Sequence, residues 1–323
     1  MTDDHPSSPL SALETAIAKK IGVKYAVLSS SGRQALQTVL QAVPVGPGDE
    51  VITSPFADSC VAAAIVDTGA RLVFADINPH TYTLEAANVE HHITKQTKAI
   101  VPVHLYGYPA NMDALMHLAN EHGLYVIEES SQALLARCDG ITTGSIGHAG
   151  CLELRGDKNK LLGCITTNDD ELAAKCRTLN PTEQVTSQQA DCWLALLNTT
   201  EERTEQRRKA AAWYAEELAG IPVVLPPDPP AEWEPSYSYY VIRTEKRTDL
   251  KTYLENHGVK GLACYPTPLY EHPLGTPFHF RAEDYPVTQQ AAQEILALPL
   301  TADITQEEIV RVCNLIREFY EEA

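Results

Sequence analysis

Apolar and polar positions along the first two thirds of the chain follow two alternating patterns. Short apolar runs rich in β-branched residues predict strands. Between these runs, apolar residues recur at helical spacing, as in 35–43, and 58–68 has the same helical character. Strands that alternate with helices predict an α/β fold with a mostly parallel sheet and helices on both faces. The predicted strands are 25–29, 50–53, 71–76, 97–104, 124–129, 148–154 and 163–167.

The pattern changes near residue 198. A long charged helix is expected over 201–218, and the next segment, 222–235, holds six prolines among its fourteen residues. We therefore expect two domains, a large α/β domain over 1–198 and a small C-terminal α+β domain over 199–323. In the small domain we expect strands at 237–243 and 261–265 and helices at 247–257, 287–296 and 305–321.

The charge of the chain argues against two classes of partner. Lys and Arg number 25 against 43 Asp and Glu, which gives a net charge of −18. A field of that sign repels nucleic-acid phosphates and anionic lipid, so we expect neither nucleic acid nor a membrane as partner. No apolar run approaches the roughly 20 residues of a membrane helix, and the opening segment is acidic. We expect a cytoplasmic protein.

The eight cysteines are scattered along the chain, with no CxxC pair and no Cys/His cluster at zinc spacing. A chain that builds a full-size core has no need of disulfides. We therefore expect free thiols and no metal site.

Candidate chemistry lies where the predicted strands end, because ligands of open parallel sheets bind beyond the carboxyl ends of the strands. The turn 29–33 leads into a helix N-terminus, which favours an anion. Two adjacent carboxylates at 128–129 lie on alternating sides of a strand, and Lys158 follows another strand. A desolvated lysine amine can form a Schiff base. Each feature also has a plainer interpretation as a helix cap, a solvated pair or a solvated charge.

Seven segments occur in an order that is typical of one family. They are VGPGDEVIT at 45–53, TGARLVFAD at 68–76, TKAIVPVHLYG at 97–107, HGLYVIE at 122–128, YPTPL at 265–269, YPV at 285–287 and LALPL at 296–300. Together they resemble the DegT/DnrJ/EryC1/StrS sugar aminotransferases, a family of fold-type-I pyridoxal-phosphate enzymes. The resemblance covers nearly the whole chain and implies the fold of these enzymes.

The resemblance also implies an activity and an assembly. It implies a homodimer with active sites at the subunit interface, and transfer of an amino group from glutamate or glutamine to a keto-sugar nucleotide or a similar polar keto compound. The cofactor would be pyridoxal 5'-phosphate, held as an internal aldimine on Lys158. By position, Gly32 matches the phosphate turn, Glu129 the carboxylate at the ring nitrogen and Gln132 the glutamine near the cofactor hydroxyl. Tyr265 and His104 are expected to contact substrate.

Several positions depart from the family pattern. Asp58 stands where an aromatic side chain usually stacks on the cofactor ring, and Glu153 stands where a serine usually binds its phosphate. A carboxylate at that position repels a phosphate. Arg33 replaces a threonine and could compensate, because a guanidinium is a good phosphate partner. The loop after Lys158 is also shortened, and the residues that reach the neighbouring subunit are replaced within 182–187.

Two hypotheses from different classes follow. The first is an aminotransferase with an unusual pocket, favoured because Lys158, Glu129 and Gln132 are in place. The second is a degenerate family member that lacks the cofactor and serves as a structural or regulatory subunit, or as the heterodimer partner of an active paralogue. Binding of a sugar nucleotide or another anion without the cofactor is a third option. We take the enzyme as the prediction.

Overall fold

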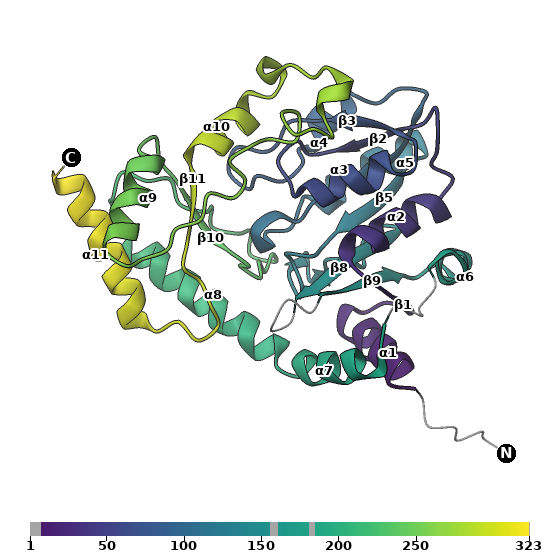
Figure 1. The fold of residues 1–323 in the computed structure, drawn as a ribbon, viewed down its shortest axis with the longest axis horizontal. Coiled ribbons are helices and arrows are strands. Elements are labelled where there is room, and N and C mark those ends of the chain that lie inside the picture. The colour runs from purple at the N-terminus through teal and green to yellow at the C-terminus, as the bar shows by residue number, and fades with distance from the viewer. Residues whose placement is uncertain (1–7, 156–160, 181–184, 323) are drawn as a thin grey trace.

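A seven-stranded sheet forms the centre of the larger part of the protein (Figure 1). The structure is a computed structural model that describes residues 8–155, 161–180 and 185–322. In spatial order the strands are β1 (Tyr25–Ser29), β9 (Leu161–Thr167), β8 (Ala149–Arg155), β5 (Tyr125–Glu129), β4 (Thr97–Val101), β2 (Glu50–Thr53) and β3 (Arg71–Phe74). Strand β9 is antiparallel to both of its neighbours, and the other pairs are parallel. The predicted α/β fold with a mostly parallel sheet is confirmed.

Both faces of the sheet are covered. Successive side chains of a strand point to opposite faces, and apolar residues on both faces must be buried. Val51 and Ile127 pack into a core on one side, whereas their neighbours Ile52 and Val126 pack into a core on the other. A third core joins the β1 end of the sheet to the first and seventh helices. The helices of this part are α1 (Pro9–Ile21), α2 (Gly32–Ala42), α3 (Ser59–Val66), α4 (Ala86–Glu90), α5 (Met112–His122), α6 (Asp170–Leu179) and α7 (Ser187–Leu197).

The C-terminal part surrounds a two-stranded antiparallel sheet with a core of its own. Figure 1 shows α8 running from the end of α7 toward the C-terminal helices. The elements are α8 (Thr200–Glu217), β10 (Tyr240–Arg243), α9 (Arg247–Asn256), α10 (Pro286–Glu294), β11 (Ile295–Leu298) and α11 (Gln306–Glu322). Val241 and Tyr285 also pack into the core of the large sheet. The domain boundary near residue 198 therefore stays a prediction.

One expectation about this part is wrong. The segment 261–265 makes only an isolated bridge between Leu262 and Ala297, because Pro266 and Pro268 lack the N–H donors that would extend the ladder. The helix expected over 287–296 is present as α10 and ends two residues earlier, where β11 begins and pairs with β10. Short elements of the described residues include β6 (Arg137–Cys138), β7 (Ile141–Thr142) and the 3₁₀ turns Leu105–Gly107, Thr276–Phe278 and Ala282–Asp284.

Three expectations about membranes, thiols and metals can be compared with the described residues. None of the helices in the described ranges is both long and apolar enough to cross a membrane. All eight cysteines lie within those ranges and are free thiols. The same ranges hold no group of three or more His, Cys, Asp or Glu side chains placed to bind a metal ion.

Candidate functional site

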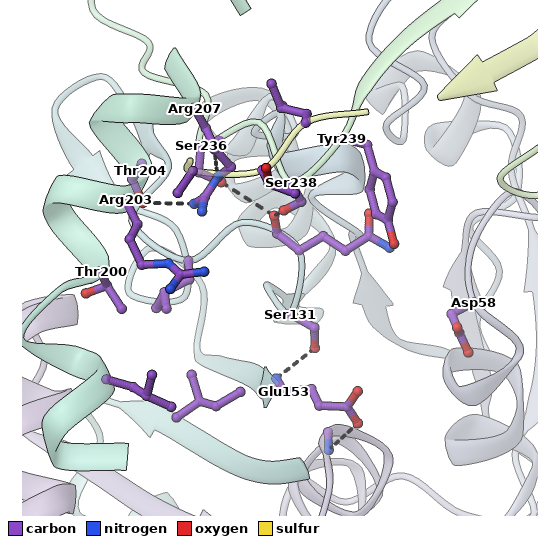
Figure 2. Close-up of a pocket in the computed structure, with 18 of the residues that line it drawn as sticks. Asp58, Ser131, Glu153, Thr200, Arg203, Thr204, Arg207, Ser236, Ser238 and Tyr239 are labelled. Atoms are coloured by element: carbon purple, nitrogen blue, oxygen red, sulfur yellow. Dashed lines mark hydrogen bonds between the residues drawn. The ribbon is translucent and has the colours of Figure 1, made fainter. Parts of the chain in front are cut away.

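A cavity of about 590 Å³ lies between the carboxyl end of β5 and helix α8 (Figure 2). One wall carries residues from the large sheet and the starts of α2 and α3. The other wall carries α8, the segment before β10 and the loop that contains Tyr265. The polar residues that line it are Asp58, Glu129, Ser131, Gln132, Glu153, Thr199, Thr200, Arg203, Thr204, Arg207, Ser236, Ser238, Tyr239, Tyr265 and Thr301. The position agrees with the expectation that ligands bind beyond the strand ends.

Glu128 and Glu129 at the end of β5 point to opposite sides of the sheet, as the strand period requires. Glu129 lines the cavity with 8 % of its surface exposed, and Ser131 N donates to its Oε1 at 3.2 Å. Burial raises the pKa of Glu129, hydrogen bonds from Ser131 oppose this rise, and the charge of Glu153 adds to it. Glu129 therefore binds a proton more readily than an exposed glutamate does.

Gln132 connects the end of β5 to the other wall. Its Nε2 donates to Tyr265 Oη at 2.8 Å, and its Oε1 accepts from Tyr106 N at 2.8 Å. The hydroxyl of Ser238 donates to its main-chain carbonyl. Burial raises the pKa of Tyr265, and the charges of Asp58 and Glu129 raise it further. Tyr265 is thus a neutral phenol held in place at the cavity wall.

Glu153 and Gly32 are in direct contact, although one lies on β8 and the other begins α2. Gly32 N donates to Glu153 Oε2 at 3.3 Å. Glu153 N in turn donates to Ser131 Oγ at 2.9 Å. A Cβ atom added at Gly32 would lie 2.8 Å from Glu153 Cβ, so no larger residue fits there. The carboxylate therefore occupies the helix N-terminus that the sequence assigns to an anion.

Asp58 lines the cavity but is also a helix cap. Its Oδ1 accepts from Cys60 N at 2.9 Å at the start of α3. A carboxylate offers no flat apolar face for a ring to stack on.

Two predicted site residues lie elsewhere. Arg33 is not among the described residues that line the cavity, and its Nη2 pairs with Asp67 Oδ2 at 2.5 Å. The predicted contact of His104 with substrate is also wrong, because His104 is fully buried with its Nε2 3.0 Å from Glu128 Oε2. Its Nδ1 accepts from Ala110 N at 2.9 Å, so Nε2 carries the proton toward Glu128. His104 holds the strand ends together.

Lys158 and residues 182–184 lie outside the described residues. The predicted role of Lys158 therefore stays a prediction, and so does the loss of contacts expected within 182–187.

Helix α8 contributes a polar wall that was not predicted from the sequence. Thr200, Arg203, Thr204 and Arg207 lie three or four residues apart and share one helix face toward the cavity. Figure 2 shows Arg203 reaching into the cavity from the side opposite Asp58 and Glu153. This stripe at helical spacing was the available signal, but in a charged helix it is equally typical of a solvated surface.

Arg207 is held more firmly than a surface arginine. Its Nε donates to Ser236 O at 3.0 Å and its Nη2 to Thr204 Oγ1 at 3.0 Å. Burial, together with the charges of Arg203 and Arg208, lowers the pKa of Arg207 to about 10. The described walls thus oppose three carboxylates to a pair of guanidinium groups.

Comparison with known proteins identifies the family. The chain matches the DegT/DnrJ/EryC1/StrS aminotransferase family over residues 8–317. It belongs to this family.

Several relatives are similar to this protein over nearly the whole chain. A UDP-N-acetyl-3-dehydro-alpha-D-glucosamine 3-aminotransferase of Acidithiobacillus ferrooxidans is 35% identical and covers 95% of this chain and 87% of the relative. A pleiotropic regulatory protein of Geobacillus stearothermophilus is 36% identical, over 95% of this chain and 88% of its own. The crystal structure of DesV from S. venezuelae in complex with a ketimine intermediate has a TM-score of 0.89, 32% identity, and coverage of 97% of this chain and 89% of its own.

The family implies pyridoxal phosphate, and the cavity suits only part of that molecule. Glu129 places a carboxylate where a ring nitrogen could be held, and Gln132 and Tyr265 offer polar groups nearby. Asp58 does not stack on a ring, and the carboxylate of Glu153 already contacts the α2 N-terminus. As these side chains stand, the phosphate end of the cofactor does not fit at α2.

Proposed function

We propose that this member of the family transfers an amino group to the keto group of a nucleotide-linked sugar. Several relatives carry names of this kind, including a dTDP-3-amino-3,4,6-trideoxy-alpha-D-glucose transaminase of Streptomyces venezuelae that is 32% identical over 97% of this chain. The observation that carries the proposal is the assembly of Glu129, Gln132 and Tyr265 in one cavity.

Two properties of the cavity support this substrate class. Its volume of about 590 Å³ is within the usual range for sites that bind small organic ligands. The guanidinium of Arg203 and the bonded guanidinium of Arg207 supply positive charge on the wall opposite the carboxylates. Guanidinium groups are good partners for phosphate, so we propose that the α8 wall binds the diphosphate of the sugar nucleotide.

The roles of the remaining residues follow from their positions. Glu129 is the carboxylate at the end of β5 that lines the cavity, and we propose that it holds a ring nitrogen. Gln132 fixes Tyr265, whose neutral phenol is available as a hydrogen-bond partner at the cavity wall. Pyridoxal phosphate, when bound, supplies the electron sink for amino transfer, and Lys158 is the lysine that we propose attaches to it.

Reduction with borohydride tests this proposal. The purified protein is incubated with pyridoxal phosphate, reduced, digested and analysed by peptide mass. We expect a reduced adduct on Lys158 and glutamate-dependent amination of a keto-sugar nucleotide, and loss of both in Lys158→Ala. Lys160→Ala, in the same segment, is the matched control and should keep both. Amination that persists in Lys158→Ala would contradict the proposal.

A second candidate function is a non-catalytic subunit of a homodimer or heterodimer. The observation that favours it is the contact of Glu153 with the α2 N-terminus, where the phosphate end of the cofactor does not fit. Absence of the adduct and of amination in the folded protein would favour this candidate. Light scattering then separates a homodimer, which we propose, from a chain that dimerises only with an active paralogue.

A further inference from the structure

The N-terminus of α2 opens onto the cavity and has the properties of an anion site. The first N–H groups of a helix have no partner within the helix, and the helix dipole favours negative charge there. Gly32 begins this eleven-residue helix and lines the cavity. The N–H of Gly32 points at a carboxylate from the protein itself, Glu153, at 3.3 Å.

The strand that carries Glu153 fixes this carboxylate in position. Glu153 pairs with Gly163 on β9, and its N–H donates to Ser131 Oγ at 2.9 Å. Its Cβ lies so near Gly32 that an added Cβ on the glycine would come within 2.8 Å of it. Strand β8 and the start of α2 therefore pack closely against each other, with the carboxylate of Glu153 at the N–H of Gly32.

We propose that Glu153 is an internal anionic ligand of helix α2, which fills the place where this helix would otherwise bind a phosphate group of a cofactor or substrate. A phosphate group at this end of the cavity is then bound more weakly, and the pyridoxal phosphate of the proposed function depends on Lys158 and Glu129 instead of on the N-terminus of α2. The inference rests on the proposed function in one respect, because both assume that this cavity is the ligand-binding site.

Two further carboxylates on the same wall of the cavity act in the same direction. Glu129 and Asp58 line the same side of the cavity, and the charge of Glu153 raises the pKa of Glu129. Arg33, the cation nearest in sequence to Gly32, is paired with Asp67 at 2.5 Å. A phosphate dianion at α2 would therefore meet the Glu153 carboxylate directly.

Binding of ligands with and without a phosphate group tests the inference. Pyridoxal phosphate, pyridoxal and inorganic phosphate are titrated in phosphate-free buffer against the wild type, Glu153→Ser and Glu153→Gln. Asp58→Asn is the matched control, because it removes one negative charge from the same cavity and keeps an acceptor for the α3 cap. Thermal unfolding without ligand shows which variants are folded.

The expected result is selective for phosphate. Glu153→Ser should bind pyridoxal phosphate and inorganic phosphate about tenfold more tightly than the wild type, with pyridoxal unchanged. Added phosphate should raise its unfolding temperature and leave that of the wild type unchanged. Glu153→Gln keeps the volume and an acceptor for Gly32 N–H, so its gain should be smaller.

Three results would overturn the inference. The first is that Glu153→Ser, or the near-isosteric Glu153→Gln if the serine variant is unfolded, binds phosphate no more tightly than the wild type. The second is an equal gain in phosphate affinity in Asp58→Asn, which would indicate a long-range effect of charge. The third is an equal gain in Glu153→Gln and Glu153→Ser, which would show that the side chain does not act by filling the place of the phosphate. The same experiment distinguishes failure of the proposed function from failure of this inference. If Glu153→Ser binds phosphate tightly but no amination is detected, the proposed aminotransferase function is contradicted and the inference about Glu153 is supported.

Discussion

Three carboxylates lie on one side of the cavity, and each has a different partner. Glu129 accepts from Ser131 N–H within the buried end of β5, Glu153 accepts from Gly32 N–H, and Asp58 accepts from Cys60 N–H. The same chemical group thus serves as a buried acid, an occupant of an anion site and a helix cap. At the scale of single residues, the surroundings decide which role each carboxylate has.

The raised pKa of Glu129 predicts a pH dependence of stability. Because its folded pKa lies above the ordinary value of 4.5, the folded protein binds this proton more tightly than the unfolded chain does. Its stabilising contribution is full below pH 4.5 and is lost as pH rises through the folded pKa. Glu129→Gln should therefore gain stability relative to the wild type as pH rises across that window. Urea unfolding at a series of pH values measures this, and a pH-independent difference would contradict it.

The elements that form the site are short and depend on caps at the cavity. Helix α3 has only eight residues, and Asp58 caps its first turn. Helix α2 is capped by Ser31, whose Oγ accepts from Gln34 N at 3.2 Å. The family resemblance implies that position 58 faces the cofactor ring, and the structure shows in addition that Asp58 caps helix α3.

Replacing this cap gives a prediction for α3. Asp58→Ala leaves Cys60 N without its acceptor and should lower the free energy of unfolding by about 1 kcal/mol. Asp58→Asn keeps an acceptor and should lie within a few tenths of a kcal/mol of the wild type. Denaturant unfolding of both variants provides the measurement. An equal loss in both would show that charge and not capping matters at this position.

At the scale of the whole molecule, Gln132 joins segments that are far apart in sequence. Its side chain bonds Tyr106 N and Tyr265 Oη, and its carbonyl accepts from Ser238. Gln132, at the end of β5, is thereby hydrogen-bonded to Tyr265 and Ser238 of the C-terminal part, which form the opposite wall of the cavity. This amide is one of several contacts that set the relative position of the two walls.

Removing that amide gives a prediction for the whole molecule. Gln132→Leu leaves the N–H of the buried Tyr106 unpaired and should cost about 1–3 kcal/mol of stability. Tyr265→Phe removes only one hydrogen bond and should cost about 1 kcal/mol. Equilibrium unfolding compares the two. A larger loss in Tyr265→Phe than in Gln132→Leu would contradict the central position of the amide.

The sequence by itself determined the pattern of strands and helices and the edge of the sheet where chemistry gathers. Period-two and helical spacing are local properties, so 50–53 was predicted with the bounds that β2 has, and Glu129 and Gln132 were expected at the end of β5. Both residues line the cavity at that edge of the sheet. The ordered motifs also identified the family.

Only the tertiary structure decided which side chains meet. The contact between Gly32 and Glu153 spans 121 residues of sequence, and that between Gln132 and Tyr265 spans 133. The burial of His104 and the pairing of Arg33 with Asp67 likewise depend on neighbours that periodicity does not specify. Local patterns report which face of an element is apolar, whereas the partner of a polar group is set by chain segments that only folding brings together.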